Sequence, residues 1–268
     1  MSGGAPRGSS LDLFDLSGCA ALVTGATGAL GGSAARALAG AGAGVALAGG
    51  NVEKLAELEV DLEAHDVVTT RIECRPQTQS DAGAMVSAVV DAFGRLDIVV
   101  LSAGINIVAP TAQMTDDEFN AVMGANVHGS WLVAQAAGRQ MLKQAEGGRI
   151  ILVSSTRGRL GHPAGYSAYC ASKSAVEGLT RALACEWGPS GITVNAIGPT
   201  VFRSDLTAWM YADDGPGREV REAMLSRIPL GRLGEPDDFA GAIVFLASGA
   251  ASFVTGQVLY IDGGYTAG

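Results

Sequence analysis

Short apolar runs alternate with stretches of helical length along almost the whole of the 268-residue chain. Several of these runs are apolar at every position, which is typical of strands in a parallel sheet that helices cover on both faces. The expected strands are Ala20–Val23, Val45–Ala48, Val67–Ile72, Ile98–Leu101, Ile150–Val153, Thr193–Ile197 and Val258–Ile261. The expected helices are Leu30–Ala39, Val52–Glu63, Asp81–Phe93, Asp116–Met141, Ala168–Glu186 and Pro236–Leu246. This alternation predicts one α/β domain, a Rossmann-like doubly wound parallel sheet of about seven strands with helices on both faces.

Two segments fall outside the alternation. Residues 1–15 are expected to form a flexible tail, because the first ten are rich in Gly and Ser and lack the apolar stretch of a signal peptide. The domain then covers residues 16–268. Within it, residues 200–232 make a long connection that is rich in aromatic side chains. We interpret this connection as a lid or substrate loop; the alternative is a surface excursion that packs on a neighbouring subunit.

Charge and composition exclude several classes of protein. The formal net charge of −9 argues against nucleic acid as a partner, because phosphate binding needs clustered Lys and Arg. No apolar run reaches the ~18 residues of a transmembrane helix, so no membrane partner is expected. The four cysteines (Cys19, Cys74, Cys170 and Cys185) are widely spaced and the chain has three histidines, so no metal site is expected. A cytoplasmic protein with reduced thiols is the simplest interpretation.

A glycine-rich turn follows the first expected strand and opens the first helix. It reads Thr24-Gly25-Ala26-Thr27-Gly28-Ala29-Leu30-Gly31-Gly32. Glycines at such a turn let the backbone approach a pyrophosphate, and the helix N-terminus offers free N–H groups. Tight turns also collect glycine for purely steric reasons. The place of this turn between strand and helix favours dinucleotide binding.

The second and third strands end without the usual signals for cofactor choice. An acidic residue after the second strand bonds the ribose 2′-hydroxyl of NAD, whereas an Arg accommodates the 2′-phosphate of NADP. This chain has Gly49-Gly50-Asn51 at that place. Arg75, after the third strand, can reach an adenosine phosphate or be a solvated surface residue. The sequence therefore leaves NAD and NADP open.

Tyr169 and Lys173 form the sharpest motif in the chain. Residues four apart lie on one face of a helix, so both side chains point the same way. A free tyrosine has a pKa near ~10, and a fixed ammonium nearby lowers that pKa and favours acid–base catalysis. The alternative is an ordinary pair on a helix surface.

Two further polar residues complete the candidate catalytic set. Ser155 follows the fifth strand, whose carboxyl end faces the ligand crevice, so its hydroxyl can hold a substrate oxygen; alternatively it only caps the strand exit. Asn126 lies inside a long helical stretch, where Asn is a mediocre helix former, so a buried role is plausible.

Together these residues resemble the short-chain dehydrogenase/reductase family over about residues 16–265. The resemblance rests on the glycine-rich turn, Ala103-Gly104, Asn126, Ser155, Tyr169-xxx-Lys173, Pro199 and Asp262-Gly263-Gly264. It implies that Tyr169 exchanges a proton with the substrate oxygen and that Ser155 holds that oxygen. It also implies that Lys173 binds the nicotinamide ribose and lowers the pKa of Tyr169, while Asn126 helps to carry a water-linked proton path. A homotetramer is common in the family, often with subunit contacts through Tyr260–Gly268.

The resemblance also implies NAD or NADP as cofactor and a set of residues that contact it. These are Gly25, Thr27, Gly28, Leu30, Gly31, Gly50, Asn51, Arg75, Ser102, Ala103, Gly104, Tyr169, Lys173, Pro199 and Val201. Four departures from the family pattern lie on this side: Ala29 in the turn, Leu101-Ser102 before Ala103-Gly104, Arg75 in place of an Asp, and Thr200 after Pro199. We therefore expect adenosine binding that is weaker or differently arranged.

Within the family the chain is similar to gluconate 5-dehydrogenase-like proteins, which act on sugar acids and polyols. Glu186-Trp187 and Phe202-Arg203 carry this similarity. Arg203 is expected to pair with a substrate carboxylate. Further substrate contacts are expected from Arg157, Arg159, His162, Tyr166 and Trp209, each of which can instead be loop surface or a subunit contact. The alternatives are a 3-oxoacyl-thioester reductase, which would favour a basic face for an acidic carrier, and a non-catalytic dinucleotide sensor.

Overall fold

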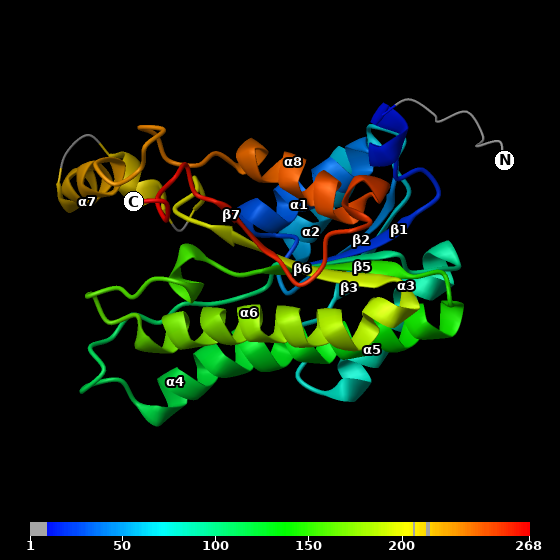
Figure 1. The fold of residues 1–268 in the computed structure, drawn as a ribbon, viewed down its shortest axis with the longest axis horizontal. Helices are drawn as coiled ribbons and strands as arrows, with labels where there is room; N and C mark the ends of the chain where they lie inside the picture. The colour runs from blue at the N-terminus through cyan, green and yellow to red at the C-terminus, as the bar shows by residue number, and fades with distance from the viewer. Residues whose placement is uncertain (1–9, 206, 213–214) are drawn as a thin grey trace, which may run out of the picture.

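A computed structural model, which describes residues 10–205, 207–212 and 215–268, shows one sheet of parallel strands with helices on both faces (Figure 1). The strands are β1 (Ala20–Thr24), β2 (Gly44–Gly49), β3 (Thr69–Glu73), β4 (Ile98–Leu101), β5 (Gly148–Val153), β6 (Ile192–Pro199) and β7 (Val258–Ile261). The helices are α1 (Ala29–Gly40), α2 (Val52–Glu63), α3 (Gln79–Phe93), α4 (Asp116–Met123), α5 (Gly129–Gln144), α6 (Ser167–Trp187), α7 (Pro216–Leu225) and α8 (Pro236–Ala247). The expected fold class is confirmed, and the expected strands agree with the observed ones to within two residues at each end.

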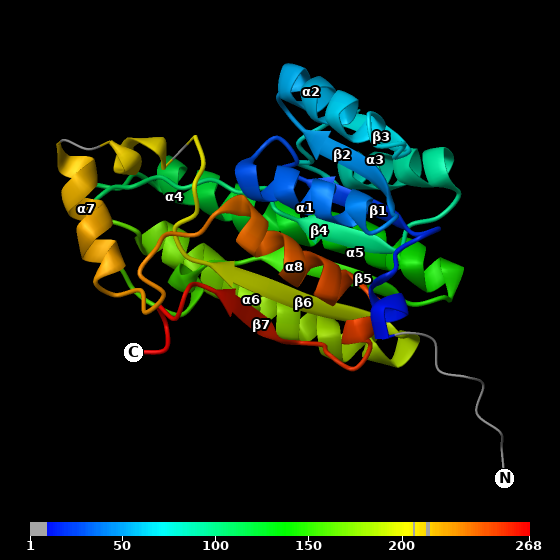
Figure 2. The ribbon, with the colours of Figure 1, turned by 90° about the horizontal axis from the view of Figure 1, so that it is seen from above.

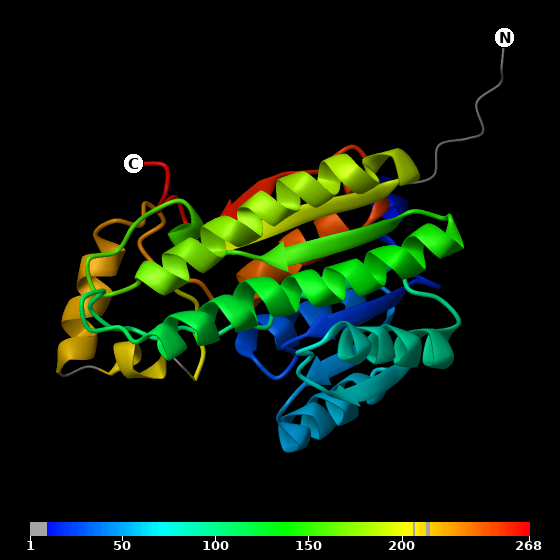
Figure 3. The ribbon, with the colours of Figure 1, turned by 90° about the horizontal axis from the view of Figure 1, so that it is seen from below.

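The apolar strands are explained by the burial of both sheet faces. In β1, Ala20 and Leu22 face a core that α3, α5 and α6 cover, whereas Ala21 and Val23 face a core that α1, α2 and α8 cover. Successive side chains of a strand point to opposite faces, so nearly every side chain of a strand with two covered faces is buried. Seen from above, α1 and α8 lie side by side (Figure 2), and from below α5 and α6 cross the other face (Figure 3).

The strand order places a crevice at the centre of the sheet. The order is β3-β2-β1-β4-β5-β6-β7, so the chain winds outward from β1 to β3 and then restarts on the other side of β1 at β4. Ligands of doubly wound sheets bind at this switch point, outside the carboxyl ends of the strands. Here the loops after β1 and β4 touch: a Cβ added to Gly25 would lie 2.8 Å from the backbone of Ala103.

The long helix expected over Asp116–Met141 is interrupted. Between α4 and α5, the residues Gly124–His128 form a π-helical turn, and this turn contains Asn126. Single π turns inside helices occur frequently at functional sites. The expected helix is therefore correct in extent but not in hydrogen-bond pattern, because i→i+5 bonding leaves no periodic signal in the side chains.

The two segments outside the alternation have some structure of their own. Ser10–Phe14, inside the expected tail, form a 3-10 helix, while residues 1–9 lie outside the described part of the chain. The 200–232 connection holds a 3-10 turn (Ala208–Tyr211) and α7, and it packs on a small cluster of Met210, Ile228, Leu233 and Tyr265. In the views of Figures 1 and 3, α7 stands beyond the carboxyl ends of the strands, close to the C-terminus. Among the described helices, none combines the length and the apolar character needed to cross a membrane.

Candidate active site

Tyr169 and Lys173 lie on one face of α6, at the carboxyl edge of the sheet, as their spacing predicts. The Lys173 Nζ is 5.6 Å from the centre of the Tyr169 ring and donates a hydrogen bond of 2.8 Å to the carbonyl oxygen of Val153. This bond ties the lysine to the last residue of β5. Lys173 is buried, and the loss of hydration lowers its pKa to about 8.

Ser155 lies directly beyond β5 and faces the tyrosine. Its backbone is extended and its Oγ accepts a 3.1 Å hydrogen bond from the Arg157 N–H, which caps a short 3-10 turn (Thr156–Gly158). A hydrogen bond to the Ser155 side chain acts to lower the pKa of Tyr169, but burial acts in the opposite direction and dominates. The pKa of Tyr169 is therefore raised. The lowered pKa that the motif predicts is not found, because the tyrosine is more deeply buried than helix spacing can indicate.

Asn126 is buried, but its polar atoms are already used. Its Oδ1 accepts from the Ile105 N–H at 2.7 Å, and its Nδ2 donates to the Ile105 carbonyl at 2.9 Å and to the Ser172 Oγ at 3.0 Å. The π turn thus holds the loop after β4 against α6, directly beside Lys173. A Cβ on Gly104 would lie 3.0 Å from Asn126 Oδ1 and 3.6 Å from Lys173 Nζ. The proton path through Asn126 stays a prediction; the clamp on the loop is what the geometry shows.

The glycine-rich turn leaves no room for a side chain at Gly25 or at Gly31. Gly25 has a φ of 66°, and a Cβ on Gly31 would clash with the Gly25 carbonyl oxygen. Gly28 is the N-cap of α1 and has no side chain that could accept from the first turn of the helix. The N–H groups in the first turn of α1 can therefore bind an anion, and the positive end of the helix dipole favours negative charge at this place. These residues fit the pyrophosphate of a dinucleotide.

The remaining expected cofactor contacts line the same edge of the sheet. Thr27 packs over the end of β2, where its methyl group would be 3.3 Å from a Cβ on Gly49. Asn51 caps α2 through a 2.9 Å bond from the Lys54 N–H to its Oδ1. The others are Leu30 in the first turn of α1, Gly50 after β2, Arg75 after β3, Ser102, Ala103 and Gly104 after β4, and Pro199 and Val201 at the end of β6.

The expected substrate residues divide into two groups. His162 and Tyr166 lie beside the tyrosine: the His162 and Tyr166 rings are 4.4 Å apart, and Tyr166 meets Tyr169 edge-on at 6.2 Å. Arg203, by contrast, forms a 3.1 Å ion pair with Glu235 and stacks at 4.0 Å on the Tyr211 ring, so it already has a carboxylate partner. Trp209 is 53% exposed.

Arg157 is buried rather than free in a loop. Its guanidinium donates to the Gly161 carbonyl at 2.9 Å and to the Tyr265 hydroxyl at 3.2 Å. Arg227, which the sequence did not indicate, lies over the same Tyr265 ring at 4.3 Å. Burial and these two guanidiniums lower the pKa of His162. No local pattern signals this cluster, because Arg157, Arg227 and Tyr265 come from three distant segments.

Glu177 is a second residue that sequence reasoning missed. Its Oε1 accepts from the Tyr260 hydroxyl at 2.9 Å and from the Ser154 Oγ at 3.0 Å. Burial and this carboxylate raise the pKa of Tyr260 to about 12. Glu177 follows Lys173 by four residues, as Lys173 follows Tyr169, and this continued spacing was the available signal. Arg159 packs over the Tyr260 ring, with its Cζ 5.8 Å from the ring centre.

Comparison with known proteins identifies the family. A family model described as enoyl-(acyl carrier protein) reductase matches residues 25–266. An uncharacterised oxidoreductase of Mycobacterium tuberculosis is 56% identical over 246 residues, which are 92% of this chain and 90% of the relative. The chain belongs to the short-chain dehydrogenase/reductase family. It is thus an NAD(P)-dependent dehydrogenase/reductase, as the sequence motifs predict.

Two relatives of this dehydrogenase illustrate the range of substrates in the family. The 3-oxoacyl-[acyl-carrier-protein] reductase of Rickettsia felis is 38% identical over 252 residues, 94% of this chain and 98% of the relative. The crystal structure of a gluconate 5-dehydrogenase from Burkholderia cenocepacia, in complex with NADP and tartrate, is similar with a TM-score of 0.90 at 33% identity. That similarity covers 97% of this chain and 99% of the other.

Proposed function

We propose that the enzyme interconverts a secondary alcohol and a ketone of a polyol, sugar or sugar acid, with Tyr169, Ser155, Lys173 and Asn126 as the catalytic set. The observation that carries this proposal is the meeting of Tyr169, Ser155 and Lys173 at the carboxyl edge of β5. The bound nicotinamide supplies the hydride acceptor for oxidation, or the hydride donor for reduction.

The proposed proton chemistry follows from the positions of the side chains. In reduction the neutral phenol of Tyr169 gives its proton to the ketone oxygen as the carbon receives the hydride from the nicotinamide. In oxidation the deprotonated form of Tyr169 takes the proton of the substrate hydroxyl as the carbon gives its hydride to the nicotinamide. Ser155 donates a hydrogen bond to that oxygen and stabilises its developing charge. Lys173, held by Val153, places a cation close to the tyrosine, and its remaining N–H groups would bind the nicotinamide ribose. An ordinary tyrosine is already neutral near pH 7, and burial raises the pKa of Tyr169 further, which favours the form that donates a proton.

The basic residues near Tyr169 favour a substrate that carries a carboxylate over one that is neutral. Arg157 and Arg227 flank Tyr265, and His162 joins this basic cluster to the tyrosine through Tyr166. His162 Nδ1 accepts from the Ala164 N–H at 3.1 Å, which leaves its other nitrogen as a donor. The gluconate 5-dehydrogenase relative with NADP and tartrate supports the same substrate class and cofactor.

A 3-oxoacyl-thioester reductase is the second candidate function. The Rickettsia relative and the description of the family model favour it. The net charge of −9 opposes it, because an acidic carrier protein would meet an acidic partner. Turnover of a 3-oxoacyl thioester above that of every polyol and sugar acid would decide for this alternative.

The test is absorbance at the reduced-nicotinamide band with a panel of polyols, sugar acids and ketones. Tyr169→Phe removes the proton-carrying group and should lower kcat by about 10²- to 10⁴-fold. Tyr260→Phe is the matched control, since it also removes a single phenolic hydroxyl but one that bonds Glu177, and it should keep the wild-type rate. Equal turnover by wild type and Tyr169→Phe would overturn the mechanism.

Arg227→Met tests the recognition of a substrate carboxylate. It should lower kcat/KM about tenfold for a sugar acid and leave kcat/KM for the matching neutral polyol unchanged.

We also propose a homotetramer in the cytoplasm. A groove of about 420 Å³ opens between α4, α5 and α6, and its lining is largely apolar, with Met123, Val127, Trp131 and Leu179. Exposed apolar grooves of this kind are typical of subunit contacts. The four free cysteines fit a reducing compartment. Light scattering should give four times the chain mass of 27.1 kDa, and a monomer would refute the assembly.

A further inference from the structure

Arg75 lies across the end of a strand other than its own. It follows β3 by two residues, yet its guanidine group covers Gly50, the first residue after β2. A Cβ on Gly50 would lie 2.9 Å from Arg75 Cζ and 3.1 Å from Arg75 Cδ, and it would clash with Nε. The missing side chain at Gly50 is therefore what lets the guanidinium lie against the backbone at this point.

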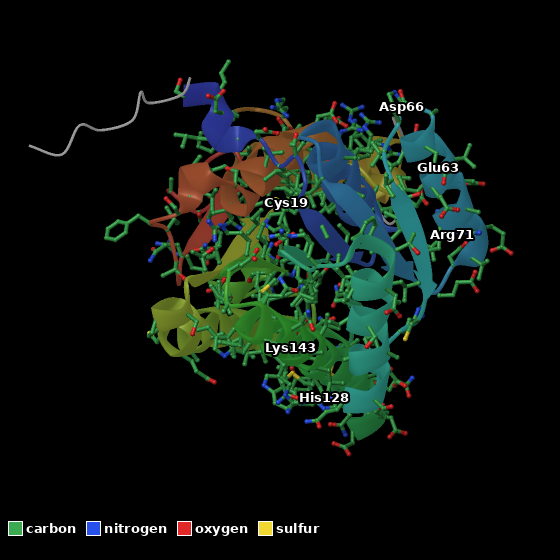
Figure 4. The ribbon with its side chains drawn as sticks, turned by 90° about the vertical axis from the view of Figure 1, so that its right-hand side faces the viewer. Cys19, Glu63, Asp66, Arg71, His128 and Lys143 are labelled. Carbon is green, nitrogen blue, oxygen red and sulfur yellow. The ribbon has the colours of Figure 1, made fainter. Side chains whose placement is uncertain are left out.

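The charge around this guanidinium is uncompensated. The segment Gly49-Gly50-Asn51 has no acidic residue, and the Asn51 oxygen is used to cap α2. Arg75 is exposed, and none of the described carboxylates forms an ion pair with it. Arg71, which lies on β3 at the edge of the sheet (Figure 4), differs in this respect. Its Nε is 2.7 Å from Oε2 of Glu59 in α2. The β3 exit thus holds a positive charge that the protein itself does not neutralise.

This charge stands next to the cradle for the pyrophosphate. Thr27 of the glycine-rich turn packs against Gly49, and Arg75 packs against Gly50, so the two contacts occupy successive residues of one strand end. In dinucleotide folds the adenosine ribose lies at the end of β2, where an acid selects the 2′-hydroxyl and an Arg accommodates a 2′-phosphate. Here no acidic residue follows β2. Instead, the guanidinium of Arg75 extends to this place from the end of β3, the neighbouring strand, and it can bind a phosphate through two N–H groups.

We propose that Arg75 binds the 2′-phosphate of NADP across Gly50. The residue that selects NADP over NAD then lies after β3 rather than after β2. The inference rests on the proposed function as a nicotinamide-dependent dehydrogenase, and it names the residue pair that decides between the two cofactors. It also explains how adenosine can be bound in a different arrangement despite Gly49-Gly50 and the Arg in place of Asp.

Calorimetric titration with adenosine fragments tests the inference without turnover. Wild type should bind adenosine 2′,5′-bisphosphate on the order of 10- to 100-fold more tightly than 5′-AMP at low salt. Arg75→Met removes the charge and should reduce this ratio to about one. Arg71→Met removes the same charge from β3, four residues earlier in the chain, and should leave the ratio unchanged. An unchanged ratio in Arg75→Met, or equal binding of both fragments by wild type, would overturn the proposal.

A second variant reverses the preference rather than abolishing it. Gly50→Asp places a carboxylate where Arg75 lies, and only the far end of a flexible side chain must move to admit it. The carboxylate should pair with Arg75 and repel a 2′-phosphate, so 5′-AMP should become the tighter ligand. The kcat/KM ratio of NADP to NAD should fall in the same variants. Fragment selectivity without turnover on any substrate would refute the proposed function alone, whereas turnover without selectivity would refute this inference alone.

Discussion

Lys173 is a cation that the fold buries, and its burial disfavours the charged form. Its ammonium donates a hydrogen bond to the Val153 carbonyl, and among the residues that the structure describes no carboxylate forms an ion pair with it. Desolvation therefore lowers its pKa to about 8. The same burial raises the pKa of Tyr169, so packing drives the two partners of the motif toward their neutral forms.

The lowered pKa of Lys173 predicts a specific pH dependence of stability. Between about pH 8 and pH 10.5 the unfolded chain binds a proton that the folded chain does not, so the free energy of unfolding rises with pH through this window. Relative to Lys173→Met, wild type should gain about 2 kcal/mol between pH 7 and pH 9.5. Urea unfolding of both proteins at several pH values measures this difference. A difference that stays constant would show that the lysine titrates normally in the fold.

At the scale of the element, the π turn at Gly124–His128 acts as a clamp. It breaks the α pattern between α4 and α5 and brings Asn126 to the loop after β4. The Asn126 amide bonds both the N–H and the carbonyl of Ile105. A side chain thus satisfies two backbone groups that have no partner in a helix or a strand. The loop that carries Ser102 and Gly104 is thereby held beside Lys173.

Asn126→Leu should therefore loosen one loop without unfolding the sheet. It leaves the Ile105 N–H and carbonyl without partners and should destabilise the protein by about 2 kcal/mol. Amide hydrogen exchange at Ile105 should become faster, while exchange in β1 and β4 should stay slow. Ser172→Ala, which removes only one of the three bonds, is the control and should change the Ile105 amide little. Unchanged protection of Ile105 in Asn126→Leu would contradict the clamp.

At the scale of the whole molecule, Tyr265 links the 200–232 segment to the loop after β5, which carries Arg157. This buried tyrosine bonds Arg157 through its hydroxyl and packs against Arg227, while Met210, Ile228 and Leu233 enclose it. Figures 1 and 3 show the C-terminal segment beside α7 at the edge where the strands end. The last residues of the chain therefore position a segment that begins more than sixty residues earlier.

Removal of the Tyr265 side chain should loosen the packing of the 200–232 segment. Tyr265→Ala empties a buried site and should cost about 3 kcal/mol of stability, whereas Tyr265→Phe loses only one hydrogen bond and should cost about 1 kcal/mol. Limited proteolysis should cut the Ala variant within residues 200–232 faster than wild type, and the KM for substrate should rise. If the two variants were cut at the wild-type rate, Tyr265 would not anchor the segment.

Local pattern was sufficient to predict most of the fold and the helix face that Tyr169 and Lys173 share. Apolar runs with no polar position predict strands that are buried on both faces, and their alternation with helices leaves few topologies other than the doubly wound sheet. The Tyr169–Lys173 spacing predicts a shared helix face, since that relation is internal to one helix. The glycine-rich turn is equally local, because its function depends on the backbone of nine consecutive residues.

Tertiary structure decided everything that depends on residues meeting from distant parts of the chain. The guanidinium of Arg75 lies on Gly50 only because β2 and β3 pair in the register that brings Gly49 opposite Glu73. The partnership of Arg203 with Glu235 and the cluster around Tyr265 likewise join segments that no spacing relates. The direction of the Tyr169 pKa also required the fold, because burial is a property of the packed chain and outweighs the neighbours that the sequence identifies.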